Sequence, residues 1–221
     1  MSFRNIEQDK PLLIFTFDDG PTEYMLKIAK VFEKYDGRAT FFVIGDKITE
    51  KTSEYIKKVV SNGHEIACHG QTHGFGTNPT YESVYREIDE GIRTINRYIP
   101  DYQVKYYRSY GLCQNEYMWQ VLSSKIKMPM ISCAYNPADW RNEVTKEDIK
   151  DRFISRILSD EVGEGDILLA HELDKTAEIF SKILEILYNK GYRFCTISEY
   201  LEQRGIDYSG LTRKDAIKTI K

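Results

Sequence analysis

The chain alternates between short apolar runs and amphipathic segments along most of its length, and this alternation limits the folds that it can adopt. Apolar residues recur at steps of three and four in the amphipathic segments, which predicts helices. The apolar runs are rich in β-branched and aromatic residues, and they predict strands at Leu12–Phe17, Ala39–Ile44, Glu65–Cys68, Val104–Tyr107, Met130–Ala134, Asp166–Ala170 and Arg193–Thr196.

Strands that alternate with helices and show few hairpin signals predict an α/β fold with a parallel sheet covered by helices. About seven such units suit a closed or nearly closed barrel as well as an open doubly wound sheet, and periodicity alone does not choose between them. A chain of 221 residues suits a single domain. We expect the catalytic domain to cover residues 1–201. Residues 202–221 are expected to form a tail or a terminal helix with no assigned function.

Composition excludes several classes of protein. A formal net charge of −3 gives no basic surface for nucleic acid, and no apolar run approaches the roughly 20 residues of a membrane-spanning helix. The first ten residues are polar and resemble no signal peptide, so we expect a cytoplasmic protein if the chain is complete, and a secreted or envelope protein if a targeting segment was removed. The cysteines form no CxxC pair, which disfavours a thiolate zinc site. Oligomeric state is left open.

Polar residues that could bind a metal or take part in catalysis follow several of the expected strands. Because active sites of α/β barrels and parallel sheets form at the carboxyl ends of strands, these residues are expected to meet at one edge. Three of the four histidines in the chain are among them. The residues concerned are Asp18 and Asp19 after the first strand, His69 and His73 after the third, Arg108 after the fourth, Asp139 and Trp140 after the fifth, and His171 after the sixth.

The spacing of His69 and His73 places two imidazoles on one side of a helical turn. Two imidazoles and one carboxylate form a common hydrolytic zinc site that leaves room for water. The side chains of Asp18 and Asp19 point in different directions, so one can bind metal while the other accepts a proton from water. Each feature alone has a simpler explanation, because Asp-Asp-Gly-Pro favours turns and a single histidine is more often a core residue. Only their combination favours a metal-dependent hydrolase.

Read in order, the segments resemble the polysaccharide deacetylase (NodB-homology) family, the fourth family of carbohydrate esterases. The resemblance spans roughly Pro11 to Leu201. It rests on Thr16-Phe17-Asp18-Asp19-Gly20-Pro21, on the segment from Gly63-His64-Glu65-Ile66 to His69-Gly70-Gln71-Thr72-His73, and on Asp166-Ile167-Leu168-Leu169-Ala170-His171. The family fold is a distorted (β/α) barrel with seven strands, so the resemblance favours the barrel.

The resemblance also implies roles for individual residues. Asp19, His69 and His73 would hold a divalent metal, most often Zn²⁺, with Co²⁺ or Ni²⁺ as alternatives. Asp18 would be the general base. His171 would be the general acid that protonates the departing amine.

The residues around this group would have supporting roles. Arg108 would orient Asp18 through a charge-assisted pair, and Asp139 would tune His171. The backbone N–H near Tyr110 would help to hold the oxyanion. Trp140 and Leu169 would form the walls of the pocket for the acetyl methyl group.

The sequence departs from the family pattern near two of these residues. The stretch Arg108-Ser109-Tyr110-Gly111 is one residue shorter than usual and lacks a proline, and Asn136 stands where an aspartate usually precedes the Asp139-Trp140 pair. The predicted function is removal of N-linked acetyl groups from an amino-sugar polymer or oligomer of the chitin or peptidoglycan type. Two alternatives stay open: a deacylase of a small or carrier-linked intracellular sugar, and a non-catalytic carbohydrate-binding relative. The expected partner is thus an N-acetylated carbohydrate.

Overall fold

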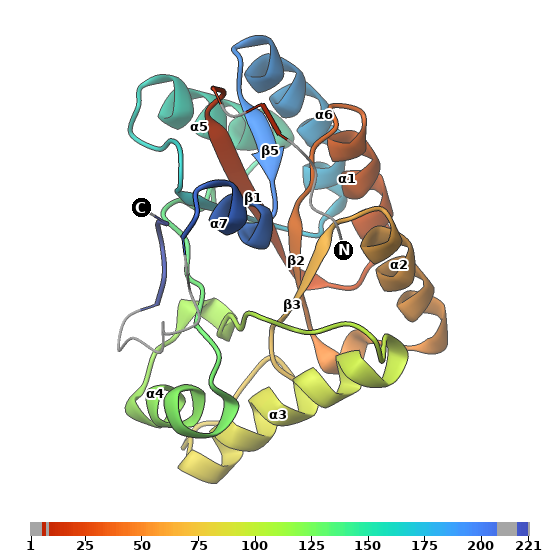
Figure 1. Cartoon of the computed structure of the whole chain (residues 1–221), viewed down its shortest axis with the longest axis vertical. Helices are drawn as coiled ribbons and strands as arrows, with labels where there is room; N and C mark the ends of the chain where they lie inside the picture. Colours follow the sequence, from red (N-terminus) through yellow and green to blue (C-terminus); the bar gives the residue numbers. More distant parts are fainter. Residues whose placement is uncertain (1–5, 8, 207–215, 221) are drawn as a thin grey trace.

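Strand β1 (Leu12–Gly20) lies at the centre of a parallel sheet (Figure 1). Its first residues pair with β5 (Arg193–Cys195), and its later residues pair with β2 (Thr40–Val43) and β4 (Ile167–His171). Strand β3 (Glu65–Cys68) extends the sheet beyond β2. The computed structural model describes residues 6–7, 9–206 and 216–220.

Single β-bridges continue the sheet from β3 round to β4. Tyr107 bridges to Cys68 on one side and to Met130 on the other, and Tyr135 bridges to Leu168 in β4. The expected strands at Val104–Tyr107 and Met130–Ala134 are therefore in place, but they are reduced to isolated bridges. Pro129 contributes to this, because proline has no N–H for a ladder. The predicted fold class, a distorted α/β barrel, is confirmed.

The segment at residues 216–220 also pairs with parts of the barrel. Ile217 bridges to Ile131, and Thr219 bridges to Asp166. The Ser132 N–H donates to the Ile217 carbonyl at 2.7 Å. Of the predicted tail or terminal helix at 202–221, the first two residues end a helix, residues 216–220 are extended, and residues 207–215 and 221 lie outside the described residues.

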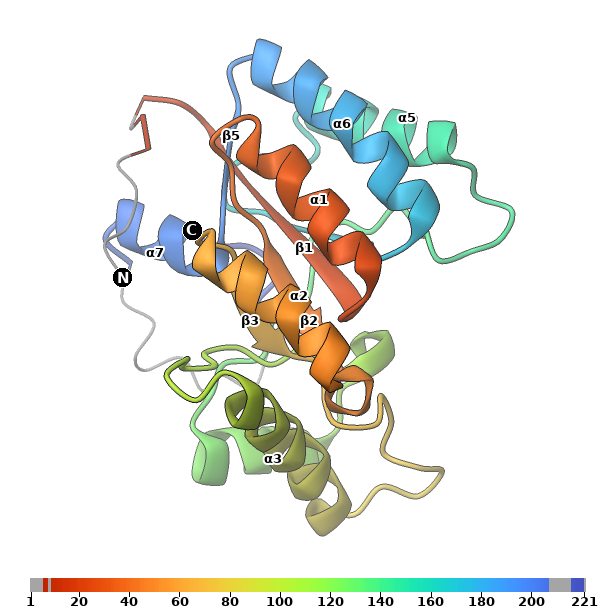
Figure 2. The ribbon, with the colours of Figure 1, turned by 90° about the vertical axis from the view of Figure 1, so that its right-hand side faces the viewer.

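Helices cover the strands on the outside, and α6, α1 and α2 lie side by side (Figure 2). Threonines begin many of them, because a threonine side chain can accept a hydrogen bond from the first exposed N–H groups. The helices are α1 (Glu23–Glu33), α2 (Glu50–Ser61), α3 (Tyr81–Tyr98), α4 (Glu116–Val121), α5 (Lys146–Leu158), α6 (Asp174–Asn189) and α7 (Ile197–Gln203), with 3-10 turns at Gly45–Lys47 and Tyr110–Leu112 and a π-helical turn at Leu122–Ile126.

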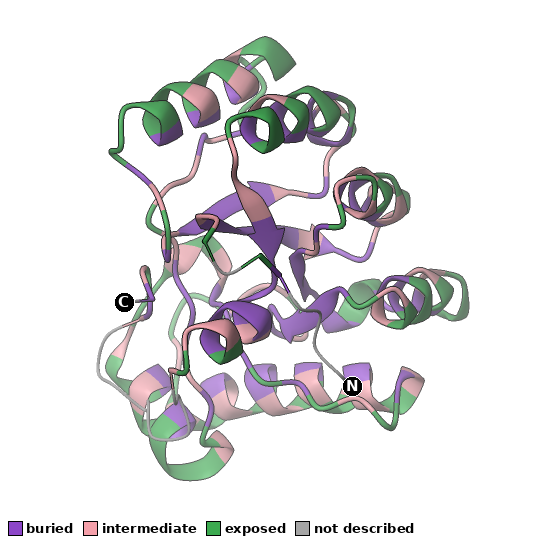
Figure 3. Ribbon diagram, turned by 45° about the horizontal axis from the view of Figure 1, so that its top comes forward, coloured by how far each residue is buried: buried purple, intermediate pink, exposed green. Residues whose placement is uncertain are grey.

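An aromatic cluster fills the core between the sheet and three of the helices. Phe15 of β1 packs edge-on against Phe32 of α1, Phe153 of α5 and Phe180 of α6, with ring centroids 5.4–5.9 Å apart. Figure 3 shows the buried strands enclosed by helices whose outer faces are exposed. This packing holds the strand ends in place. Among the described residues, the helices are all too short or too polar to cross a membrane.

Candidate functional site

The ends of β1 and β4 bring two of the predicted residues together. Asp18 and His171 are register partners on these neighbouring strands. They open onto a cavity of about 430 Å³ at the carboxyl edge of the sheet. The cavity is lined by Asp18, Asp19, His69, His73, Gly111, Leu112, Asn136, Trp140, Leu169 and His171. The structure thus gathers most of the predicted site residues, and it places Arg108, Asp139 and Tyr110 outside this lining.

Asp19, His69 and His73 form a group that could hold a metal ion, and they are called the metal-ligand group below. The Asp19 Oδ1 atom lies 3.5 Å from His69 Nε2 and 3.1 Å from His73 Nε2. It is buried and accepts no hydrogen bond from the described residues. Donor atoms bound to one tetrahedral zinc lie roughly 3.3–3.5 Å apart, given bonds of about 2.0–2.1 Å. The separations and the chemistry of these donors therefore fit a divalent metal.

The backbone reaches this arrangement through a loop, and the prediction of a helical turn at His69–His73 is wrong. Residues 71–73 form bends, and residues 70 and 74 are irregular, so the segment contains no helix. Gly70 has φ +88°, His73 has φ +70° and Asp19 has φ +69°. Left-handed backbone is unfavourable for residues other than glycine, and it concentrates at functional sites. The two histidines converge because the loop folds back, which their spacing does not reveal.

A second contact orients the His69 ring. Its Nδ1 atom lies 2.8 Å from the Arg108 carbonyl oxygen, which can only accept, so Nδ1 carries a proton, and in the neutral ring Nε2 has the lone pair that a metal would need. Burial alone would raise the pKa of Asp19, but the neighbouring imidazoles of His69 and His73 hold that pKa well below its usual range. The carboxylate is thus ionised, as a metal ligand must be.

Asp18 is buried beside a fully buried arginine. Arg108 Nη1 donates to Asp18 Oδ1 at 2.7 Å and to Thr16 Oγ1 at 2.8 Å. Its Nη2 donates to the Ser132 carbonyl, and its guanidinium lies 4.0 Å from the centroid of the Phe42 ring. The other carboxylate oxygen, Asp18 Oδ2, lies 3.7 Å from His69 Nε2 and faces the metal-ligand group.

His171 is held by Asp139 on the opposite side of the cavity. The Asp139 carboxylate accepts from the His171 Nδ1 atom at 2.6 Å, from its backbone N–H at 2.7 Å and from Thr176 Oγ1 at 2.8 Å. Burial opposes charge on this ring, but the Asp139 carboxylate outweighs it and raises the pKa of His171 above its ordinary 6.5. Nε2 is then the ring nitrogen available to the cavity.

The two residues predicted to form the walls of the acetyl pocket line the cavity, whereas the Tyr110 ring packs elsewhere. Trp140 is exposed and Leu169 is buried, and both line the cavity. Tyr110 does not line it: its ring packs against His73 and Phe75, with centroids 5.8 and 5.3 Å away.

Three lining residues, Gly111, Leu112 and Asn136, were not predicted as site residues. Leu112 has φ +57° in the shortened loop, and this backbone turn brings it to the cavity. Asn136 accepts from the Ala138 N–H through Oδ1 at 2.7 Å, which fixes the orientation of its side-chain amide. The short loop and the unusual asparagine were the only signals for them in the sequence.

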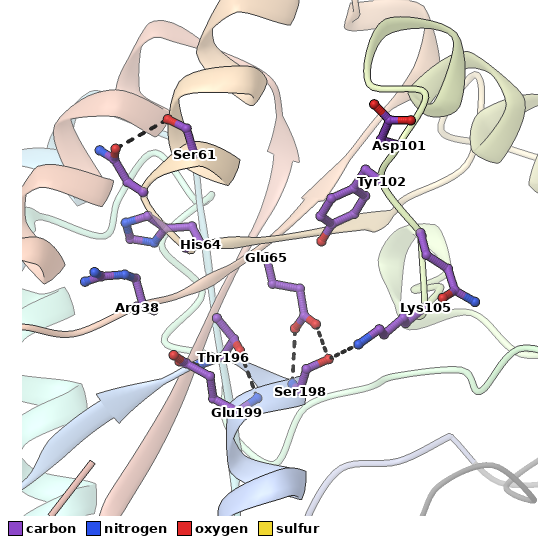
Figure 4. Close-up of a pocket in the computed structure, with 13 residues that line it drawn as sticks. Arg38, Ser61, His64, Glu65, Asp101, Tyr102, Lys105, Thr196, Ser198 and Glu199 are labelled. Carbon is purple, nitrogen blue, oxygen red and sulfur yellow. Dashed lines mark hydrogen bonds between the residues drawn. The ribbon is translucent and has the colours of Figure 1, made fainter. Parts of the chain in front are cut away.

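A second cavity, of about 360 Å³, lies near the amino end of β3 (Figure 4). Glu65 there accepts from Thr40 Oγ1 at 2.8 Å and from Ser198, and burial raises its pKa. His64 accepts from the Ala39 N–H at 3.1 Å. Within the described part of the chain, this cavity holds none of the metal-ligand group. We interpret these polar groups as structural.

The functional site lies at the other end of the barrel, where water, a metal and a proton donor could meet. Groups of this kind are those of hydrolases that activate water. Residues 5–127, more than half of the chain, match the family model for polysaccharide deacetylase. The chain therefore belongs to the polysaccharide deacetylase family, as its motifs predicted, and it is a hydrolase of that family.

Individual relatives agree with this assignment. A bifunctional xylanase/deacetylase from Pseudobutyrivibrio xylanivorans is 30% identical over 90% of this chain, which spans only 32% of that relative. A peptidoglycan-N-acetylglucosamine deacetylase from Bacillus cereus is 27% identical, with 90% of this chain and 92% of the relative covered. The esterase-family domain of a xylanase from the hindgut metagenome of Trinervitermes trinervoides superposes with a TM-score of 0.83 at 26% identity, covering 96% of this chain and 98% of the other.

Proposed function

We propose that this protein is a metal-dependent N-deacetylase of an amino-sugar polymer or oligomer, of the peptidoglycan or chitin type. The observation that carries the proposal is the cavity itself, where Asp19 meets two imidazoles on one side and His171 stands on the other. The Bacillus cereus relative, whose name specifies peptidoglycan N-acetylglucosamine, supports this substrate class because almost its full length is covered.

Asp19, His69 and His73 would hold the ion, with Zn²⁺ as the leading candidate and Co²⁺ or Ni²⁺ as alternatives. When bound, such an ion supplies Lewis-acid chemistry that polarises the acetyl carbonyl and makes water more acidic. Asp18 would accept the proton of the attacking water through Oδ2, which faces the ligand group. Arg108 would orient this carboxylate through Oδ1.

His171 would protonate the departing nitrogen, because an amine leaves poorly without a proton. Asp139 would hold the ring in position and stabilise its charged form. The oxyanion would lie beside the backbone N–H near Tyr110, at the start of the Tyr110–Leu112 turn. Trp140 and Leu169 would enclose the acetyl methyl group.

Removal of the metal is expected to abolish acetate release from N-acetylglucosamine oligomers, and added Zn²⁺ is expected to restore it. The check is an acetate assay on chelator-treated and reloaded protein, with metal content measured in parallel. Peptidoglycan fragments and nucleotide-linked N-acetyl sugars serve as comparison substrates, and the second set tests the small-sugar alternative. Zinc-loaded protein that bound the oligomers but released no acetate from any substrate would favour the non-catalytic alternative instead.

The rate is expected to depend on pH as a bell-shaped curve. The ascending limb of such a curve belongs to the general base, which must be unprotonated to accept the proton of water. At high pH His171 loses the proton it must donate, and its raised pKa places this descending limb above pH 6.5.

The variant Asp139→Asn is expected to move the descending limb to lower pH and to reduce kcat, because it removes the charge that stabilises the protonated ring. Profiles of kcat against pH for both proteins check this. Asp151→Asn, which alters an exposed acid on α5, is the matched control. A descending limb unchanged by Asp139→Asn would contradict the assignment of that limb to His171.

A further inference from the structure

Glu87 of α3 is a buried acid that contacts the loop between two of the metal-ligand residues. Its Oε1 atom accepts the backbone N–H of Thr72 at 2.8 Å and that of His73 at 3.0 Å. Its Oε2 atom accepts the Thr72 hydroxyl at 2.9 Å. Oε1 also accepts the Gly74 N–H at 3.4 Å, so one carboxylate binds four donors of a loop that has no helical hydrogen bonds of its own.

Two glycines allow α3 to approach this loop closely. A Cβ atom at Gly91 would lie 2.7 Å from the carbonyl carbon of Gly70, and a Cβ at Gly70 would clash with the Glu87 carboxylate. The Gln71 N–H also donates to the Glu87 carbonyl at 2.9 Å. The helix and the loop thus fit together through backbone contacts as well as through the side chain of Glu87.

The loop needs such a restraint because of the conformation of His73. A histidine with φ +70° is in an unfavourable backbone region, and it persists only where its surroundings enforce it. The His69 ring is oriented by the Arg108 carbonyl. The place of His73 depends on the bend of the loop, and the bend is the part that Glu87 binds.

We propose that Glu87 is a positioning residue that folds the 70–74 loop so that His73 Nε2 lies near Asp19 Oδ1 before any metal binds. The inference rests on the proposed metal site of Asp19, His69 and His73. It implies that Glu87 contributes to metal affinity through the backbone, while it contacts none of the three donor atoms. The carboxylate acts as an acceptor, so its hydrogen bonds matter more than its charge.

The test compares Glu87→Ala, Glu87→Gln and Glu90→Ala, the last changing an exposed acid of the same helix. The dissociation constant for Zn²⁺ is measured by chelator competition, at a temperature where circular dichroism shows each metal-free protein to be folded. Glu87→Ala is expected to raise this constant about 10- to 100-fold, the usual effect of losing an outer-shell partner. Glu87→Gln is expected to stay within about threefold, because its Oε1 atom still accepts from the backbone N–H groups. Glu90→Ala is expected to match the wild type.

Amide hydrogen exchange at Thr72 and His73 in metal-free protein provides a second readout, and Glu87→Asp provides a milder variant if Glu87→Ala does not fold. Exchange at these two loop amides is expected to speed up in Glu87→Ala and Glu87→Asp, with the amides of α3 unchanged. If Glu87→Ala and Glu87→Asp both bound Zn²⁺ with wild-type affinity, or if Glu87→Gln bound it as weakly as Glu87→Ala, the role of Glu87 would be wrong. The proposed function would not be affected by either result. A wild-type protein that bound no zinc would instead overturn the proposed function.

Discussion

The variant Asp18→Asn is expected to reduce kcat for acetate release about 10²- to 10⁴-fold while it leaves the metal content unchanged. An amide cannot accept the proton of the attacking water. Its oxygen can still accept from Arg108, however, so the buried contact at Oδ1 and the fold are kept. The check is kcat at saturating substrate together with metal analysis of the same sample.

Asp19→Ala is the contrasting variant, because it removes an oxygen from the metal-ligand group. It is expected to lose both metal and activity. The assignment of Asp18 as the base is wrong if Asp18→Asn keeps more than about a tenth of the activity, given the size of effect that base catalysis has elsewhere. Loss of metal from Asp18→Asn would instead make Asp18 a ligand.

The variant Arg108→Met is expected to destabilise the fold by about 3–5 kcal/mol, because removal of one partner leaves a buried charge uncompensated. The Asp18 carboxylate would lose its ion pair, and the Ser132 carbonyl would lose its donor. For a chain of this size the melting temperature should fall by about 10 °C. Thermal unfolding followed by circular dichroism measures this directly.

Arg93→Met is the matched control, since Arg93 is an exposed arginine paired with Asp89 on α3, and such pairs contribute about 0–1 kcal/mol. The double variant Asp18→Asn/Arg108→Met should be less unstable than the sum of the two single changes, because it removes the stranded charge. If Arg108→Met melted within about 2 °C of the wild type, the buried pair would not stabilise the protein as argued.

Much of the fold could be predicted from the sequence because strand and helix patterns are local. The apolar runs marked every regular strand of the described chain, and the strand-end rule brought Asp18 and His171 to one edge. The bridge between Ile217 and Ile131 could not be predicted, since it joins residues far apart in the chain and Ile217 lies outside every predicted strand. Periodicity also could not show that two expected strands would shrink to single bridges.

The candidate site was predictable where a residue type carries the chemistry and less so where the backbone does. The metal-ligand group follows from two histidines and an aspartate after strands. The bend that unites it depends on positive φ angles at residues such as His73, which the sequence does not display. Glu87 was invisible for a related reason: in a helix rich in acids, a glutamate beside apolar residues resembles an ordinary surface residue.

The register between β1 and β4 has a consequence for how such enzymes diverge. Asp18 and His171 face each other on strands joined by main-chain hydrogen bonds, at the roughly 4.8 Å spacing of any sheet. Loops that carry Leu112, Asn136 and Trp140 can gain, lose or exchange residues without moving this pair. A lineage with this scaffold can therefore change which sugar it accepts by altering its loops, while the two residues that we propose as base and acid are inherited together with the sheet.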